Sequence, residues 1–283
     1  MSWTTLISAD ELAASIDPCL VIDCRFQLQD PLGGRRLFGD GHIPGAVFLD
    51  QDHDLAGTKN GRNGRHPLPD RARLAARLAR AGLSQGRQLV VYDAQGGQFA
   101  VRLWWLARWL GHADVALLDG GLEAWQRAGY PVTTQITEPL AGNFSESASL
   151  VPMVSADEVL ANLGSGARVV VDARAPERYR GEVEPMDPVA GHIPGALNRP
   201  IGRNLRPDGR FKPAEILRAE WLALLGSRAP ADIINQCGSG INACHNILAM
   251  ELAGLPGSAL YAGSWSEWCA DPSRPIAKGP QPG

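Results

Sequence analysis

The sequence predicts an α/β protein made of two tandem domains, each a mainly parallel sheet flanked by helices. Two observations carry this prediction. Short apolar runs of strand length alternate with stretches of helical spacing along the chain. Five sequence patterns also occur twice in the same order, at offsets between 143 and 150 residues. A chain of 283 residues is long enough for two domains that each bury a core.

The repeated patterns define the duplication. The clearest is GHIPGA, which stands at Gly41–Ala46 and again at Gly191–Ala196. The other pairs are SADE at 8–11 and 155–158, VIDCR and VVDAR at 21–25 and 170–174, VVYD at 90–93 and the run that ends at Cys237, and LLDGGLEAW and LYAGSWSEW at 117–125 and 260–268. We therefore expect one domain at residues 1–134, a polar linker at 135–152 and a second domain at 153–283.

In the first copy, Ser8 and Glu11 form a capping-box signature, which predicts a helix from about Ser8. The elements expected after it are a strand at Leu20–Asp23, a helix at Leu74–Ala81, a strand at Leu89–Tyr92, a helix at Phe99–Leu110, a strand at Val115–Leu118 and a short helix at Glu123–Ala128. This alternation indicates a parallel sheet covered on both faces. Functional sites in such sheets lie at the carboxyl ends of the strands.

In the second copy, Ile233 and Ile234 predict a buried strand that ends at Cys237. Helical spacing begins at Ala243 and continues to a stop at Gly254. A cysteine between a strand and a helix start lies where unpaired N–H groups and the helix dipole favour an anion such as a thiolate. We therefore predict that Cys237 is a nucleophile.

The residues after Cys237 support this prediction. Gly238 and Gly240 allow a tight turn in which successive N–H groups converge on one point. The alternative is that Cys237 is a small buried apolar residue, which is the commonest fate of a free cysteine. Packing alone does not require the two glycines.

The corresponding position of the first copy is Asp93. A carboxylate cannot perform thiol chemistry, so only the second domain is expected to be active. The Asp–x–Arg pattern after each strand and both GHIPGA turns occur in the two copies alike, which favours a structural role for them.

Composition excludes several other classes of function. The net charge is −3, from 27 basic and 30 acidic residues, and no basic run is present, so neither nucleic acid nor an anionic membrane is an expected partner. No signal peptide or membrane span is predicted, and we expect a cytoplasmic protein. Five cysteines without a CxxC pair predict neither a disulfide framework nor a metal site, and Cys19 and Cys24 fit packing roles.

Taken together, these features closely resemble the tandem-domain rhodanese family of sulfurtransferases. The resemblance covers essentially the whole chain and includes the tryptophan pair at 104–105, the DGG turn at 119–121 and the GSW–x–EW ending at 263–268. Within the family, the CGSG loop at 237–240 is similar to that of the 3-mercaptopyruvate sulfurtransferases. Thiosulfate enzymes typically have basic residues after the cysteine.

The resemblance implies a two-step transfer through a Cys237 persulfide, with pyruvate leaving from mercaptopyruvate or sulfite from thiosulfate. Cyanide, a small thiol or thioredoxin then accepts the sulfur, and no cofactor is implied. The loop amides implied to stabilise the anionic sulfur and contact the donor run from 238 to 242, and thus include Gly238, Gly240, Ile241 and Asn242.

The resemblance also assigns roles to individual side chains. Ser239 matches a serine that assists proton transfer to the leaving enolate, although it also fits a turn hydroxyl. Arg178 matches an arginine that binds the donor carboxylate by bidentate pairing, and the alternative is a surface ion pair with Glu177 or Glu182. His42 matches a histidine near that serine, but because His192 repeats it, a structural role is favoured for both.

Two departures from the family pattern bear on the donor. Mercaptopyruvate enzymes often carry a second arginine before the second GHIPG turn, whereas this chain has Met186 and Asp187. That contact is therefore missing or supplied from elsewhere. The family usually continues Val–Thr after CGSG, whereas here Ile241 and Asn242 follow. Asn242 is expected to cap the next helix.

Three alternatives remain at this point. A phosphatase loop of the form Cys–x5–Arg would need arginine at position 243, which is Ala243. A non-catalytic sulfur carrier would not need the nucleophile and the glycines around it. A thiosulfate-preferring sulfurtransferase would use the same mechanism with a different donor.

Overall fold

The computed structural model describes residues 2–283, which fold into two compact units. The first unit contains the residues up to Gly57, together with Pro69–Leu150 and Pro207–Phe211. The second contains Thr58–Leu68, Val151–Arg206 and Lys212–Gly283. Each unit therefore includes a short segment from the other half of the sequence, at 58–68 and at 207–211.

The first unit is a five-stranded sheet in the order β1-β5-β4-β2-β3, and all neighbouring strands are parallel. Its strands are β1 (Leu6–Ile7), β2 (Leu20–Asp23), β3 (Val47–Phe48), β4 (Leu89–Tyr92) and β5 (Val115–Leu118). Its helices are α1 (Ala9–Ala14), α2 (Gly33–Asp40), α3 (Arg71–Arg80), α4 (Ala100–Trp109) and α5 (Gly121–Arg127).

The second unit repeats this arrangement in the order β6-β10-β9-β7-β8, again with parallel neighbours. Its strands are β6 (Met153–Val154), β7 (Val169–Asp172), β8 (Leu197–Asn198), β9 (Ile233–Gln236) and β10 (Ala259–Tyr261). Its helices are α6 (Ala156–Ser165), α7 (Pro176–Tyr179), α8 (Ala214–Leu225), α9 (Asn242–Leu252) and α10 (Ser264–Trp268), with 3-10 turns η1 (Ile201–Asn204) and η2 (Pro230–Asp232).

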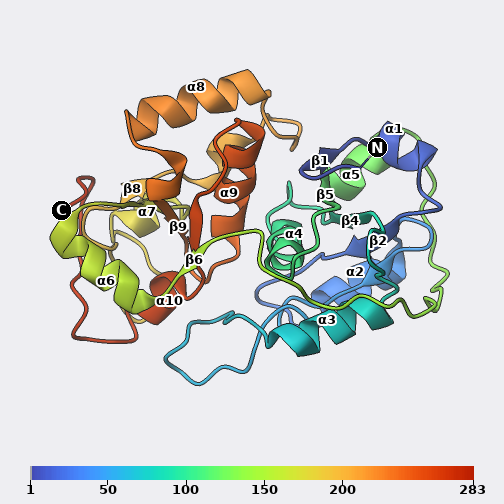
Figure 1. The fold of residues 1–283 in the computed structure, drawn as a ribbon, viewed down its shortest axis with the longest axis horizontal. Helices are drawn as coiled ribbons and strands as arrows, with labels where there is room; N and C mark the ends of the chain where they lie inside the picture. The colour runs from blue at the N-terminus through green and yellow to red at the C-terminus, as the bar shows by residue number, and fades with distance from the viewer. Residues whose placement is uncertain (1) are drawn as a thin grey trace. The chain divides into compact units, whose positions relative to one another are not determined.

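Helices cover both faces of the second sheet. One face packs on α6, α7 and α10 in a core that includes Val159, Tyr179 and Trp265. Helix α9 packs against β9 and β10, and α8 packs on α9 (Figure 1). All four residues of β7 and of β9 are therefore buried, although only the first three of β7 and the first two of β9 are apolar.

The two capping boxes predicted from the SADE repeats are present. Ser8 and Ser155 each accept a hydrogen bond from the amide three residues on, and Glu11 and Glu158 each accept one from the cap amide. The same contacts lower the pKa of both glutamates, mainly through hydrogen bonds from the cap serines. The repeat therefore gives each unit the same helix start.

The predicted fold class is confirmed, and most predicted elements of the first copy are present. Helix α3 begins three residues earlier than expected, because Asp70 caps it by accepting from the Arg73 amide. The helix after Cys237 begins at Asn242, and its cap position is Ile241 without a side-chain hydrogen bond. The expectation that Asn242 caps this helix is therefore wrong.

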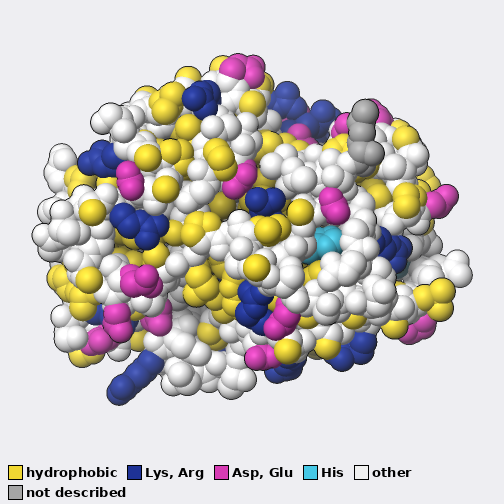
Figure 2. All heavy atoms as spheres, viewed as in Figure 1, with side chains coloured by type: hydrophobic (Ala, Val, Ile, Leu, Met, Phe, Trp, Pro, Cys, Tyr) yellow, Lys and Arg dark blue, Asp and Glu magenta, His cyan; other side chains and the backbone are white. Residues whose placement is uncertain are grey.

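Two further features of residues 2–283 bear on function. None of their helices is long and apolar enough to cross a membrane, and no cluster of His, Cys, Asp and Glu could hold a metal ion. On the face drawn in Figure 2, basic and acidic side chains are interspersed among apolar ones.

Candidate active site

Cys237 follows strand β9 directly, at the carboxyl end of the second sheet, and is 2% exposed. Within residues 2–283, two backbone amides donate to its Sγ, from Gly240 at 3.1 Å and Ser239 at 3.5 Å. Helix α9 starts five residues after the cysteine. The predicted arrangement of a sulfur atom held by loop amides before a helix start is therefore present.

Two residues around Cys237 have a left-handed backbone, a glycine in its own loop and a serine at the start of α10. Gly240 has φ +81°, and a Cβ there would collide with the carbonyl oxygen of Ala262. Ser264 has φ +54°, the only positive value among the described residues other than glycine. Its Oγ accepts from the Cys237 amide at 3.0 Å and donates to the Tyr261 carbonyl at 2.9 Å. These contacts fix the backbone that carries the sulfur.

The first unit holds a carboxylate in the equivalent loop. Both oxygens of Asp93 accept backbone hydrogen bonds, from the amides of Gln95, Gly97, Phe99 and Ala100 at 2.8–2.9 Å. Burial raises the pKa of Asp93, although these four donors act to lower it. The equivalent loops thus hold a carboxylate in the first unit and a cysteine sulfur in the second, each by backbone amides.

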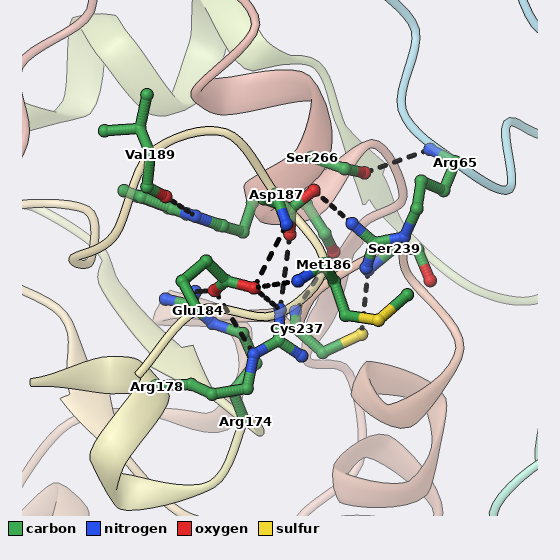
Figure 3. A network of polar contacts seen from close by, with 12 residues as sticks. Arg65, Arg174, Arg178, Glu184, Met186, Asp187, Val189, Cys237, Ser239 and Ser266 are labelled. Atoms are coloured by element: carbon green, nitrogen blue, oxygen red, sulfur yellow. Dashed lines mark hydrogen bonds and ion pairs between the residues drawn. The ribbon is translucent and has the colours of Figure 1, made fainter. Parts of the chain in front are cut away.

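A cluster of arginines and carboxylates borders the Cys237 loop (Figure 3). Arg178, on α7, donates to Glu184 through Nη2 at 2.6 Å and Nε at 3.2 Å, and to Asp187 Oδ2 at 3.3 Å. Arg65 pairs with the other oxygen of Asp187. Glu184 and Asp187 side chains are only 3% exposed, whereas those of Arg178 and Arg65 are 19% and 25% exposed. The surface ion pairs considered for Arg178 are replaced by these buried partners.

Arg174 has a different position in this cluster. It forms a bidentate pair with Asp172, at distances of 2.6–3.1 Å, donates to the Gly191 carbonyl and lies over the Trp265 ring. Burial acts to lower the pKa of Arg174, but Asp172 and Glu184 outweigh it and raise that pKa. Arg25 and Asp23 repeat the pair in the first unit, which confirms the structural role expected of this pattern.

The histidine beside Ser239 is His66, and sequence reasoning missed it. His66 Nδ1 lies 2.8 Å from Ser239 Oγ, and both residues are buried in the second unit. His42, which had been matched to this position, instead has its ring nitrogens on the carbonyls of Phe38 and Gln135. Assigning that match to His42 was wrong.

His192 is placed in the second unit as His42 is in the first. Its ring nitrogens lie against the carbonyls of Tyr179 and Pro282. Both imidazoles are fully buried and stack on an aromatic ring. The structural role favoured for the repeated histidines agrees with these contacts.

The predicted loop residues differ in what they do around the sulfur. Gly238 borders the arginines, since a Cβ there would lie 2.8 Å from Arg65 Nη2 and 3.4 Å from Arg178 Nη1. The amides of Ser239 and Gly240 hold Sγ, whereas those of Gly238, Ile241 and Asn242 make no hydrogen bond to it. Of the five amides expected to contact Sγ, from 238 to 242, two therefore do so.

All five cysteines are free and buried. Burial raises the pKa of Cys19 and Cys24, and raises that of Cys269 to about 11. These thiols are therefore poor nucleophiles at neutral pH.

Comparison with known proteins agrees with the resemblance. The Rhodanese-like domain family matches twice, at residues 8–128 and 155–271. A Pseudomonas aeruginosa protein named "Probable 3-mercaptopyruvate sulfurtransferase" is 49% identical over 99% of this chain and 100% of its own. A mouse protein named thiosulfate sulfurtransferase is 33% identical over 98% of this chain and 96% of its own.

The solved structure of a similarly named enzyme has the same architecture. SseA from Escherichia coli, described as a 3-mercaptopyruvate sulfotransferase, superimposes with a TM-score of 0.80 and 32% identity, over 94% of this chain and 99% of its own. The duplicated fold, the cysteine loop and these matches lead to one conclusion: the chain is a tandem-domain member of the rhodanese family of sulfurtransferases.

Proposed function

We propose that this enzyme transfers the sulfur of 3-mercaptopyruvate to a thiol or cyanide acceptor through a persulfide on Cys237. The observation that carries the proposal is the position of Cys237 Sγ, held by the Gly240 and Ser239 amides beside the arginine cluster. The cysteine sulfur and two partly exposed guanidinium groups thus border one loop. The similarity to proteins named for this donor supports the same choice.

The first step is a displacement at sulfur. The Cys237 thiolate attacks the mercaptopyruvate sulfur, the carbon–sulfur bond breaks, and its electron pair passes to carbon to give the pyruvate enolate. Cys237 retains the sulfur as a persulfide, and the enolate takes a proton to become pyruvate. The two loop amides stabilise the sulfur anion without a metal.

Ser239 and His66 provide a path for the proton that the enolate needs. Ser239 Oγ stands two residues from the nucleophile and 2.8 Å from His66 Nδ1. We assign Ser239 as the group that delivers the proton. His66 orients the Ser239 hydroxyl and returns a proton to it after each transfer. Sulfite, the product from thiosulfate, is a stable anion and does not require this proton.

Arg178 binds the donor carboxylate in this proposal. Its guanidinium is partly exposed and borders Gly238, next to the nucleophile. Glu184 holds its Nε and Nη2, which leaves Nη1 directed at the loop. A planar guanidinium held on one edge can present its other edge to a carboxylate.

The second step regenerates the thiolate. An acceptor thiolate or cyanide attacks the outer sulfur, the sulfur–sulfur bond breaks, and the electron pair returns to Cys237. The result is ping-pong kinetics with the persulfide as the intermediate. The first unit takes no part in bond making, because Asp93 occupies its anion-holding loop. We place this reaction in the reducing cytoplasm, consistent with five free thiols.

The test is intact-mass analysis after treatment with mercaptopyruvate and no acceptor. One added sulfur atom, absent from Cys237→Ser, is the expected result, and Cys269→Ser is expected to keep both the mass change and turnover. Full activity in Cys237→Ser would refute the mechanism. A protein that takes up sulfur but releases none to any acceptor would instead be a sulfur carrier.

Thiosulfate preference is the second candidate, because similar proteins carry that name. A side-by-side kcat/KM for the two donors, with one dithiol acceptor, decides between them. We expect the larger value for mercaptopyruvate, since Gly238 and Ser239 follow the cysteine in place of basic residues.

A further inference from the structure

We propose that Arg65 is a second donor-binding residue, which together with Arg178 forms a two-guanidinium site for the donor carboxylate, with Asp187 setting the position of both. This inference rests on the proposed function and adds a residue from the 58–68 segment to it. No sequence pattern around Arg65 indicates such a role.

The backbone of Arg65 is anchored beside the loop. Its amide donates to Ser266 Oγ at 3.0 Å, at the start of α10. The preceding Gly64 has φ +82°, and a Cβ there would lie 2.8 Å from the Gly263 carbonyl oxygen. The segment therefore approaches the Gly263 backbone as closely as a glycine permits, and the Arg65 side chain extends toward the Cys237 loop (Figure 3).

Arg65 and Arg178 border one point. A Cβ on Gly238 would lie 2.8 Å from Arg65 Nη2 and 3.4 Å from Arg178 Nη1. Gly238 is the residue after the nucleophile, so both guanidinium groups are next to the place where the donor sulfur must lie. Any side chain at 238 would fill the space between them.

The nitrogen atoms that face this point have hydrogen-bonding capacity left. Among residues 2–283, neither Arg65 Nη2 nor Arg178 Nη1 has a hydrogen-bond partner, and Arg65 Nε is buried without one. Buried guanidinium N–H groups without partners cost free energy. A bound carboxylate, with two acceptor oxygens, would satisfy donors from both arginines.

Asp187 connects the two arginines. Its Oδ1 accepts from Arg65 Nη1 and its Oδ2 from Arg178 Nη2, and its side chain is 3% exposed. One carboxylate thus holds both guanidinium groups by their far nitrogens. This arrangement prepares the site before the donor arrives, which reduces the cost of ordering two long side chains on binding.

The charges around the loop favour a donor with one negative charge. Three arginines, Arg65, Arg174 and Arg178, are matched by three carboxylates, Asp172, Glu184 and Asp187. A dianion such as thiosulfate would enter a site without surplus positive charge and next to the sulfur anion. Removing the charge of Asp187 would change that balance by one unit in favour of the dianion.

The experiment is steady-state kinetics of full-length Arg65→Gln with mercaptopyruvate and, separately, thiosulfate. Losing charge-assisted hydrogen bonds predicts a KM for mercaptopyruvate that rises by about tenfold or more, with kcat within about twofold of the unchanged protein. Arg65→Lys keeps the positive charge but lacks the planar guanidinium that pairs with both oxygens of a carboxylate. It should recover only part of the affinity for mercaptopyruvate. Arg62→Gln, on the same segment, should change neither constant.

A second measurement separates donor binding from a structural role. Pyruvate, a carboxylate without sulfur, should inhibit Arg65→Gln more weakly than the unchanged protein, by a factor close to the rise in KM. Asp187→Asn should raise the kcat/KM ratio of thiosulfate to mercaptopyruvate, whereas an unchanged ratio would show that Asp187 does not set donor charge.

Several results would overturn the inference. An unchanged mercaptopyruvate KM in Arg65→Gln, or an equal fall in kcat for both donors with KM constant, would mean that Arg65 only supports the loop. Failure of the proposed function looks different, since the unchanged protein would then form no persulfide from either donor.

Discussion

At the level of single side chains, the contact between Ser239 and His66 is the one that the proposed mechanism uses to deliver a proton. Their atoms are 2.8 Å apart and both side chains are buried. The contact joins a residue two positions after the nucleophile to one from a segment far away in the sequence. In the proposed mechanism this contact is a proton path, which can be changed without altering Cys237.

We predict that His66→Gln lowers kcat for mercaptopyruvate by roughly 10²-fold or more, because proton transfer to the enolate is impaired. Turnover of thiosulfate should fall much less, since sulfite leaves without a proton. Parallel kinetics with both donors check this, and His42→Gln is the control for loss of a buried imidazole. Equal losses for both donors in His66→Gln would assign His66 to folding rather than to proton transfer.

Sequence reasoning predicted the part of the candidate site that is local in the chain. Cys237, Ser239, Gly240 and Arg178 follow strands or a repeated pattern, so their neighbours along the chain predict their positions. His66 was missed because its segment has no periodicity and its partner is a serine more than 170 residues away. The available signal was a histidine in a loop rich in arginine and glycine. That signal does not identify the residue that His66 contacts.

At the level of elements, the turn between β9 and α9 determines where the sulfur lies. Gly240 combines a left-handed backbone with close approach to the Ala262 carbonyl. The turn also places the Gly240 amide 3.1 Å from Sγ. One residue, Gly240, thus sets the conformation of the turn and supplies a hydrogen bond to the sulfur.

Gly240→Ala is expected to lower the free energy of unfolding by at least about 1–3 kcal/mol, the cost of a strained residue, and to reduce transfer strongly. Denaturant unfolding and donor turnover measure the two effects. Gly257→Ala is a matched control, because Gly257 has φ +98° but open space around its Cβ position. Equal effects at both positions would show that strain alone, without the collision, explains the loss.

The two capping boxes predict a pH dependence of stability. Hydrogen bonds from the cap serines lower the pKa of Glu11 and Glu158 in the folded state. The stabilisation is present above the unfolded value, near 4.5, and is lost as the pH falls through the lower folded values. Replacing both residues, as Glu11→Gln with Glu158→Gln, should flatten that part of the stability curve.

Urea unfolding between pH 3 and pH 6 measures this effect. Because other carboxylates also titrate there, the relevant quantity is the difference in slope between the unchanged protein and the double variant. A variant with stability that falls as steeply as that of the unchanged protein would contradict the prediction.

The strands β2, β4 and β5 were predicted at their observed limits because each is a buried apolar run. β1 and β3 have two residues each, too few to show any period, and they exist because a longer neighbour provides hydrogen bonds. Helix α7 is four residues long and lacked a signal for the same reason. The length of each strand or helix therefore decided whether the sequence could predict it.

At the scale of the whole molecule, the compact units do not coincide with the halves of the sequence. Thr58–Leu68 belongs to the second unit and Pro207–Phe211 to the first. The second segment is tied to its unit by the Phe211 amide, which donates to Asp119, and by Arg127, which donates to the Asp208 carbonyl. The repeat predicts two domains but not this exchange of segments.

We predict that residues 151–283 on their own have a mercaptopyruvate kcat/KM at least about tenfold below that of the full chain, because Arg65 and His66 are missing. A full chain cut near the exposed Leu140 should keep its activity. If the fragment does not fold, the double variant Arg65→Gln with His66→Gln makes the same test. Full activity in either would contradict the prediction.

The exchanged segments also constrain how such a protein can evolve after its gene has doubled. A recombination event at the midpoint would pass on the cysteine but separate it from an arginine and a histidine encoded upstream. On the roles proposed for Arg65 and His66, descendants that inherit only the downstream portion would lack part of the donor site.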